Sequence, residues 1–378
     1  MAAAKIDIET IRIPSSHIIL ISDIHFGRYN SSEEWQESMS KYFYEWFIPF
    51  VKRELAKNPD AVLCCLGDVY QDRNAINIDV NNLVIDIFEE LASIIPCYIL
   101  NGNHDLSKSS NKGNSSLRSL SNINNLTLIR DTTMLQFVEG RKNVAKVIAV
   151  PYLGECALEN KKLVEFSTKA DFAFMHTEIS KMKFDNGMTI VGAVDAEKFA
   201  GRVISGHIHR RQETDKVVYI GSPYHLDRGD IGDVKGIYTL DLTTKELSFT
   251  PNDFSPIFTR VHVKEFMEMD DATRHSVLDN NYVDIIMEES DTHMFKKSDI
   301  YDLINSCNAK KAEPKVRQSK KSQTADSSTN ADEIVELSLE ELINNSIDSL
   351  TDVSDEFKAD LHVLSDNYYN AAKEQMGV

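Results

Sequence analysis

Short apolar runs alternate with longer segments of helical spacing along the first hundred residues. Continuous apolar runs cover residues 18–21, 61–66 and 94–100, and each has the length of a buried strand. Between these runs, residues 35–57 and 77–93 carry apolar side chains at helical spacing. The order strand, helix, strand, helix, strand predicts an α/β fold with a parallel portion in its sheet.

More strand-like runs follow, and the pattern of apolar and polar residues changes near residue 252. These runs lie at residues 126–129, 134–138, 144–150, 172–175, 203–205, 217–220, 236–240 and 247–250. Two further runs at 258–263 and 282–287, with a helix-like segment at 298–306, predict a small α+β capping domain. We therefore expect a first domain over 1–252, a capping domain over 253–306, a flexible basic linker over 307–332 and a terminal element over 333–378.

The terminal element has the pattern of two amphipathic helices. It suggests a docking element for a partner, and the alternative is a helical hairpin folded back on its own domain. The candidate partner-binding side chains are Leu342, Ile343, Leu350, Phe357, Leu361 and Leu364. In the first domain, the aromatic face of helix 35–57 fits a core position, and a dimer surface is the other interpretation.

The net charge of −18 by itself argues against binding of nucleic acid, but the acidic residues are unevenly placed. Residues 331–378 hold twelve acidic and two basic side chains, so the front of the chain remains compatible with DNA. Five scattered cysteines with no Cys-x-x-Cys pair exclude a zinc ribbon and a disulfide framework. Because no apolar run reaches the length of a membrane span or forms a leader segment, we expect a cytoplasmic protein without membrane contact.

Polar clusters follow the apolar runs at the points where strands should end. Because ligands bind at the carboxyl ends of strands in such sheets, we expect these clusters to meet. Asp23 and His25 should point the same way in an extended segment, and Gly102 should allow a turn with positive φ. The members are Asp23, His25, Asp68, Asn103, His104, Asp105, His176, His207 and His209.

The residue types fit two divalent cations. One cation would take Asp23, His25, Asp68 and His209, and the other would take Asp68, Asn103, His176 and His207, with Asp68 as the bridge. Imidazole and oxygen ligands without a thiolate suit Mn²⁺, Fe or Zn²⁺. His104 would then protonate a leaving oxygen or stabilise the transition state, and Asp105 would orient the His104 ring.

Five motifs in this order resemble the calcineurin-like metallophosphoesterase family. They are Asp23-x-His25, Gly67-Asp68, Gly102-Asn103-His104-Asp105, the lone His176 and Gly206-His207-x-His209. The resemblance implies a β-sandwich of mixed sheets flanked by helices, and the ligand assignment above agrees with the family's pattern. It also implies a metal-dependent phosphodiesterase.

Within that family, Gly221-Ser222-Pro223, the capping domain, the linker and the terminal helices resemble SbcD-type nucleases. These are relatives of the meiotic-recombination nuclease, and the T-even-phage members look most similar. The resemblance implies a double-strand-break repair nuclease, 3′→5′ on duplex DNA and endonucleolytic on single strands. It implies two Mn²⁺, with Mg²⁺ less active, a homodimer, and an SbcC-type coiled-coil ATPase bound at 333–378. Gln71 stands where several relatives have Asp or His, which leaves the polarity open.

Other assignments stay open. Lys108, Lys112 and Arg118 lie in or beside a polar loop and contact a phosphate backbone or only solvent. A protein phosphatase or nucleotide phosphodiesterase of the same fold is the first alternative function. Protein phosphatases carry Gly-Asp-x-x-Asp-Arg-Gly and Gly-Asn-His-Glu, whereas this chain has Asn74 and Asp105 at the final positions and one extra residue. A non-catalytic scaffold is the remote alternative, because such chains lose ligands that are all present here.

Overall fold

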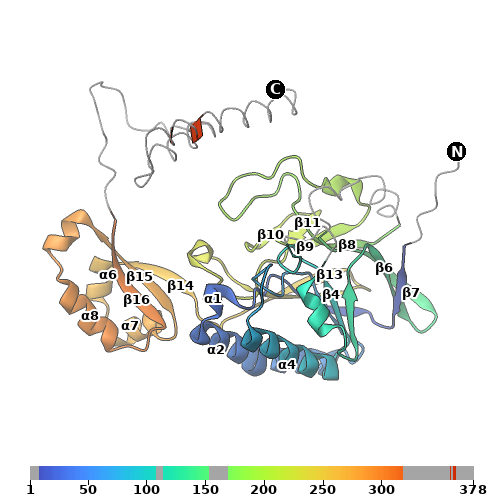
Figure 1. Ribbon diagram of the computed structural model, residues 1–378, viewed down its shortest axis with the longest axis horizontal. Coiled ribbons are helices and arrows are strands. Elements are labelled where there is room, and N and C mark those ends of the chain that lie inside the picture. Colours follow the sequence, from blue (N-terminus) through green and yellow to red (C-terminus); the bar gives the residue numbers. More distant parts are fainter. Residues whose placement is uncertain (1–7, 108–113, 153–168, 318–357, 359–360, 363–378) are drawn as a thin grey trace. The chain divides into compact units, whose positions relative to one another are not determined.

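The computed structural model describes residues 8–107, 114–152, 169–317, 358 and 361–362. The chain divides into two units, Met1–Ser319 and Lys320–Val378, and nearly all described residues belong to the first. That unit contains a six-stranded, a seven-stranded and a three-stranded sheet (Figure 1). No helix in the described part of the chain is long and apolar enough to cross a membrane.

The six-stranded sheet carries the three apolar runs that begin the chain. Its order is β13-β12-β2-β3-β4-β5, in which β2 to β5 are parallel and the other two strands are antiparallel. Its strands are His17–Ile21 (β2), Val62–Cys65 (β3), Cys97–Leu100 (β4), Leu126–Ile129 (β5), Gly236–Asp241 (β12) and Glu246–Pro251 (β13).

The seven-stranded sheet has the order β1-β6-β7-β8-β9-β11-β10. Its pairs are mixed, since β7, β8, β9 and β11 are parallel while β6 runs antiparallel to β7. Its strands are Thr10–Ile13 (β1), Thr133–Glu139 (β6), Lys142–Val150 (β7), Phe172–His176 (β8), Arg202–Gly206 (β9), Gln212–Glu213 (β10) and Val217–Tyr219 (β11).

The core between the two sheets is apolar throughout. Leu20 and Cys64 from one sheet join Phe137, Phe174 and Ile204 from the other in a single buried cluster. Strands β2 and β3 are buried on both faces, which is why they are continuous apolar runs in the sequence. The predicted fold class, a sandwich of mixed sheets flanked by helices, is confirmed.

A helical layer covers the outer face of the six-stranded sheet (Figure 1). It comprises α2 (Glu33–Lys41), a π-helical turn (Tyr42–Phe47), α3 (Ile48–Lys57) and α4 (Ile78–Ile94). Ser32 caps α2 and Asn77 caps α4 by accepting backbone N–H bonds with their side chains. Phe43, Phe47 and Phe50 are buried in this layer, so the aromatic face of helix 35–57 is core.

The described residues of the first unit also form shorter helical turns. They are α1 (Arg28–Ser31) and the 3₁₀ turns Ser116–Leu120 (η2), Ala196–Lys198 (η3), Arg228–Asp230 (η4) and Glu289–His293 (η5).

The three-stranded sheet forms the cap with its own apolar core. It consists of parallel strands Phe258–His262 (β14), Tyr282–Glu288 (β15) and Lys311–Arg317 (β16), with helices Val263–Glu268 (α6), Asp271–Leu278 (α7) and Lys297–Asn305 (α8). Strand β16 corrects the sequence analysis, which placed these residues in the flexible linker.

Charge pairing explains why β16 was missed. Lys315 Nζ lies 2.9 Å from Asp284 Oδ1 on β15, and Arg317 Nη1 lies 3.4 Å from Glu288 Oε1. The strand is therefore basic because its neighbour is acidic, and a sequence search for apolar alternation does not detect it. The boundaries at residues 252 and 333 stay predictions.

Candidate active site

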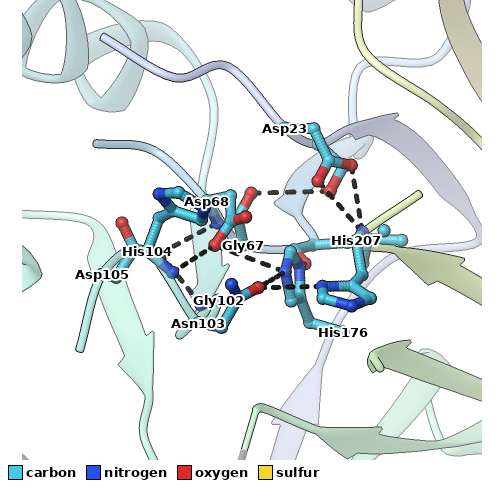
Figure 2. Close-up of polar contacts among 12 residues, drawn as sticks. Asp23, Gly67, Asp68, Gly102, Asn103, His104, Asp105, His176 and His207 are labelled. Carbon is cyan, nitrogen blue, oxygen red and sulfur yellow. Dashed lines mark hydrogen bonds and ion pairs between the residues drawn. The ribbon is translucent and has the colours of Figure 1, made fainter. Parts of the chain in front are cut away.

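The nine residues that the sequence analysis singled out lie where strands of both sheets end. Strands β2, β3 and β4 lead to Asp23, His25, Asp68, Asn103, His104 and Asp105, while β8 and β9 lead to His176, His207 and His209. Figure 2 shows Asp68, Asn103, His176 and His207 directed toward a common space. Asp23, His25, Asp68 and His176 are fully buried, so their charges and lone pairs face protein and not bulk water.

The backbone at these residues is unusual. Asp23, His25, Asp68 and His207 have φ of 54°, 54°, 55° and 91°, in the region that glycine favours. The expectation that Asp23 and His25 share one side of an extended segment is therefore wrong. The turns are fixed by cross-strand bonds, since Asp23 N–H donates to Gly67 O at 3.0 Å and His25 N–H to Asp68 O at 3.0 Å.

Gly102 is required for close approach, and not for positive φ as the sequence analysis expected. A Cβ atom at this position would lie 2.1 Å from Asp68 Oδ1 and 2.2 Å from Asp68 N. The absence of a side chain lets the loop after β4 lie directly against the loop after β3.

Asp23, His25 and His209 form the first group of potential ligands. His25 Nε2 lies 3.0 Å from His209 Nε2 and 3.6 Å from Asp68 Oδ2. His25 Nδ1 is buried and has no hydrogen-bond partner among the described residues. Facing imidazole nitrogens beside two carboxylates match the expected first cation position.

Asp68, His176 and His207 form the second group, which Asn103 completes. Asn103 Oδ1 lies 3.0 Å from His176 Nε2 and 2.8 Å from His207 Nδ1 (Figure 2). His176 Nε2 also lies 3.3 Å from Asp68 Oδ1. One oxygen of Asp68 therefore faces each group, as a bridging carboxylate would.

The electrostatics of the two groups suit a divalent cation. Burial lowers the pKa of His25 far below its usual value and that of His207 to about 3, so both rings are neutral, the form that binds metals. His176 Nδ1 lies 2.7 Å from Leu66 O, which fixes Nδ1 as the donor and aims Nε2 at the site. Burial opposes the charge on His176, but Asp68 raises its pKa to about 9, so a cation competes with a proton there.

His104 lies beside the first group and is oriented by the backbone. Its Nδ1 lies 2.7 Å from Gln71 O, and its ring packs edge-on against that of His25 with centroids 4.8 Å apart. This leaves Nε2 available for proton transfer. The sequence does not predict this role of Gln71, because every residue has a backbone carbonyl.

Asp105 does not orient His104, and that expectation is wrong. Its carboxylate accepts the N–H groups of Asp68 and Gly102 at 2.9 Å, of Val69 at 3.0 Å and of Tyr70 at 3.1 Å. Asp105 therefore ties the loop after β3 to the loop after β4 and sets the position of Asp68.

The remaining predicted residues are only partly described. Arg118 is exposed on η2, while Lys108 and Lys112 lie outside the described residues. Leu361 is half-buried in a helical turn. Five other candidate partner-binding residues also lie outside the described residues, namely Leu342, Ile343, Leu350, Phe357 and Leu364.

Several neighbours of the site have no signal in the sequence. Glu178 Oε1 lies 3.6 Å from His207 Nε2, and Asp185 Oδ2 lies 3.7 Å from His209 Nδ1. Lys235 donates to the carbonyl of His209. Each comes from a loop that no motif marks, so only the fold brings it to the site.

The sequence pattern of the calcineurin-like phosphoesterases matches residues 16–211, the span that contains every residue of both groups. The chain belongs to this family. It is an enzyme, a metal-dependent phosphodiesterase, and the two ligand groups agree with that class. Both the family and the class of enzyme were predicted correctly from the sequence.

Similarity to a viral nuclease subunit extends well beyond the family domain. The chain is 25% identical over 365 residues to exonuclease subunit 1 of Enterobacteria phage T4, covering 94% of this chain and 99% of that protein. Among solved structures, Pseudomonas putida nuclease MPE is 14% identical, with 62% and 87% of the two chains covered and a TM-score of 0.27. The calcineurin-like phosphoesterase YfkN from Bacillus subtilis is 17% identical, with 60% and 84% covered and a TM-score of 0.31.

Proposed function

We propose that this chain is the nuclease subunit of a complex that processes DNA ends in double-strand-break repair and recombination. It would act as a 3′→5′ exonuclease on duplex DNA and as an endonuclease on single strands. One observation carries the proposal. The match to the phage exonuclease subunit covers 94% of the chain, and so includes the cap and extends beyond the phosphoesterase domain.

Two divalent cations, Mn²⁺ by preference and Mg²⁺ with less activity, would be held by the two ligand groups that share Asp68. When bound, they supply an activated water and offset the charge of the phosphate oxygens. The chain supplies the rest. His104 Nε2 gives a proton to the leaving oxygen, while Gln71 O keeps the ring in place. Asp105 holds the loop of Asp68 through three of that loop's backbone amides.

The proposal includes a larger assembly. Residues 333–378 would bind an SbcC-type coiled-coil ATPase, and two copies of the chain would pair through the helical layer of α2, α3 and α4. DNA would approach with its phosphates near Arg118 and the loop that holds Lys108 and Lys112. The protein would be phage-encoded and act in the cytoplasm of a bacterial host.

Digestion of linear duplex DNA tests this function. Substrates labelled at the 3′ or the 5′ end are incubated with the protein in Mn²⁺, in Mg²⁺ and in EDTA. We expect shortening from the 3′ end in Mn²⁺, less in Mg²⁺ and none in EDTA, because both ligand groups need a cation between their acceptor atoms.

The variant His104→Ala is the matched control. It should cut at least about 100-fold more slowly, as expected for loss of a general acid, while it still binds the wild-type number of Mn²⁺ ions. Cleavage that persists in EDTA would contradict the proposal. Intact DNA together with rapid Mn²⁺-dependent hydrolysis of an aryl phosphodiester would favour a nucleotide phosphodiesterase.

A further inference from the structure

Lys235 is a buried cation next to the site. It is 4% exposed, and a lysine is rarely buried to this extent unless it is paired. Its Nζ donates to His209 O at 2.7 Å and contacts Asp230 Oδ1 at 2.5 Å and Asp233 Oδ2 at 3.5 Å. The ammonium therefore joins two carboxylates of one loop to the backbone of a candidate ligand from another loop.

Both carboxylates are themselves fixed. Asp230 Oδ2 accepts the backbone N–H groups of Leu226 at 2.7 Å and Asp227 at 3.3 Å. Asp233 accepts from Arg210 Nε, with its two oxygens 3.0 and 3.3 Å away. Arg210 follows His209 directly in the chain. The loop of residues 230–235 therefore holds the His209 turn by two contacts, one to the backbone carbonyl of His209 and one to the side chain of Arg210.

The carbonyl of His209 also accepts the N–H of Ser222 at 3.1 Å. On the side-chain face, Asp185 Oδ2 lies 3.7 Å from His209 Nδ1. The ring is thus held between a fixed backbone and an acidic neighbour, with Nε2 directed at His25 Nε2, 3.0 Å away. Small displacements of a ligand are enough to weaken a metal site.

We infer that Lys235 is a positioning residue that holds His209 in place for the first cation, through the His209 carbonyl. The inference rests on the proposed function, since it takes His209 to be a ligand. It differs from a general role in stability, because it concerns one cation position and not the other. Loss of a residue that orients a ligand typically weakens metal binding by about 10- to 100-fold.

Calorimetric titration of the metal-free protein with Mn²⁺ tests the inference. The wild type should bind two equivalents. Lys235→Met should bind one with unchanged affinity and the other about 10- to 100-fold more weakly. The double variant Lys235→Met/Asp230→Asn should show the same Mn²⁺ binding as Lys235→Met alone. Because it removes both charges of the buried pair, it leaves no unpaired carboxylate at residue 230.

Lys245→Met is the control for the residue type. Lys245 is exposed and pairs with Asp171 away from the site, so both Mn²⁺ affinities should stay at the wild-type values. With an aryl phosphodiester at saturating Mn²⁺, Lys235→Met should lower kcat more than it raises KM, since the reacting centre and not substrate binding is disturbed.

Three results would overturn the inference. A folded double variant that binds both Mn²⁺ ions with wild-type affinity removes the positioning role. Unfolding of both Lys235 variants would show that the residue supports the whole fold. A wild-type protein that binds fewer than two ions removes the ligand assignment as well. Two bound ions without cleavage of DNA would count against the nuclease proposal alone.

Discussion

Asp68 shows how much of the site depends on single residues. Its side chain faces both ligand groups, its backbone adopts a φ of 55°, and its N–H is held by Asp105. A non-glycine residue in this region costs roughly 1 kcal/mol or more, and such strain persists where surrounding bonds enforce it. Asp105 provides that enforcement by accepting the N–H groups of Asp68 and of the two residues after it.

Replacement of Asp68 by alanine would remove an oxygen from both proposed cation positions at once. We predict that Asp68→Ala loses Mn²⁺-dependent cleavage by at least about 1000-fold while its circular dichroism stays that of the wild type. Asp72→Ala is the control, because this aspartate lies four positions further on and is exposed. A fully active Asp68→Ala protein would refute the shared-carboxylate arrangement.

At this scale the sequence predicted which side chains meet, but not how they are held. Strand ends marked by apolar runs were enough to group Asp23, His25 and His209, whose atoms lie in one cluster. The roles of Asp105 and Gln71 depend on backbone N–H and C=O groups, which are the same in every residue. A single sequence does not reveal them.

Among the elements, the segment between β11 and β12 links the cap to the phosphoesterase domain. Arg228 Nε lies 2.7 Å from Asp284 Oδ2 on β15, and Arg228 Nη2 lies 3.0 Å from Asp284 Oδ1. Phe258 N–H on β14 donates to His225 Nδ1 at 3.2 Å. The same segment ends at Lys235, which contacts Asp230, Asp233 and the carbonyl oxygen of His209. It therefore contacts both the cap and the candidate active site.

The forked Arg228–Asp284 contact should hold the cap sheet in place. We predict that Arg228→Ala lowers the protection of β15 amides against hydrogen exchange by roughly 1 kcal/mol, since the pair is partly exposed. Arg202→Ala serves as the comparison, because Arg202 pairs with Glu213 far from the cap. Equal protection of β15 in the wild type and Arg228→Ala would contradict this role.

The buried Asp230–Lys235 pair gives stability a defined pH dependence. Burial alone would raise the pKa of Asp230, but Lys235 and two backbone amides bring it below its usual value. A lowered folded-state pKa stabilises the fold above the unfolded pKa of about 3.9, and this contribution disappears as the pH falls through the folded-state pKa.

We therefore predict that Asp230→Asn lowers the free energy of unfolding by about 3 kcal/mol at pH 7, and that the gap to the wild type closes below about pH 4. Thermal melts from pH 3 to 7 measure this difference in stability. Asp253→Asn is the control, because Asp253 is exposed. A gap that stays constant down to pH 3 would show that the Asp230 carboxylate is not the stabilising form.

In the molecule as a whole, strands of both sheets supply residues of the candidate active site. The segment between β11 and β12, which leads to this site, also contacts the cap. Apolar runs predicted most of the strands but not β1 or the short, polar β10, and the partners of the strands across the sandwich came from the family resemblance. The strand β16 was missed because it is stabilised by charge pairs with β15. Long-range pairing of this kind is visible only once the fold has brought the segments together.

Removal of residues 333–378 tests how far the first unit is self-sufficient. We predict that the truncated protein keeps its basal Mn²⁺-dependent cleavage, because both ligand groups lie within residues 23–209. It should no longer capture an SbcC-type ATPase in a pull-down, whereas we expect the full chain to do so. Retained capture would favour the alternative of a helical hairpin folded back on its own domain.

We propose that strand ends from the two sheets form one site for two cations. Anomalous diffraction at the manganese edge, from crystals grown with Mn²⁺, would locate the bound ions. We expect two peaks roughly 3.5–4 Å apart, both in contact with Asp68, one beside His25 and His209 and one beside His176 and His207. A single peak, or two peaks that do not share Asp68, would contradict it.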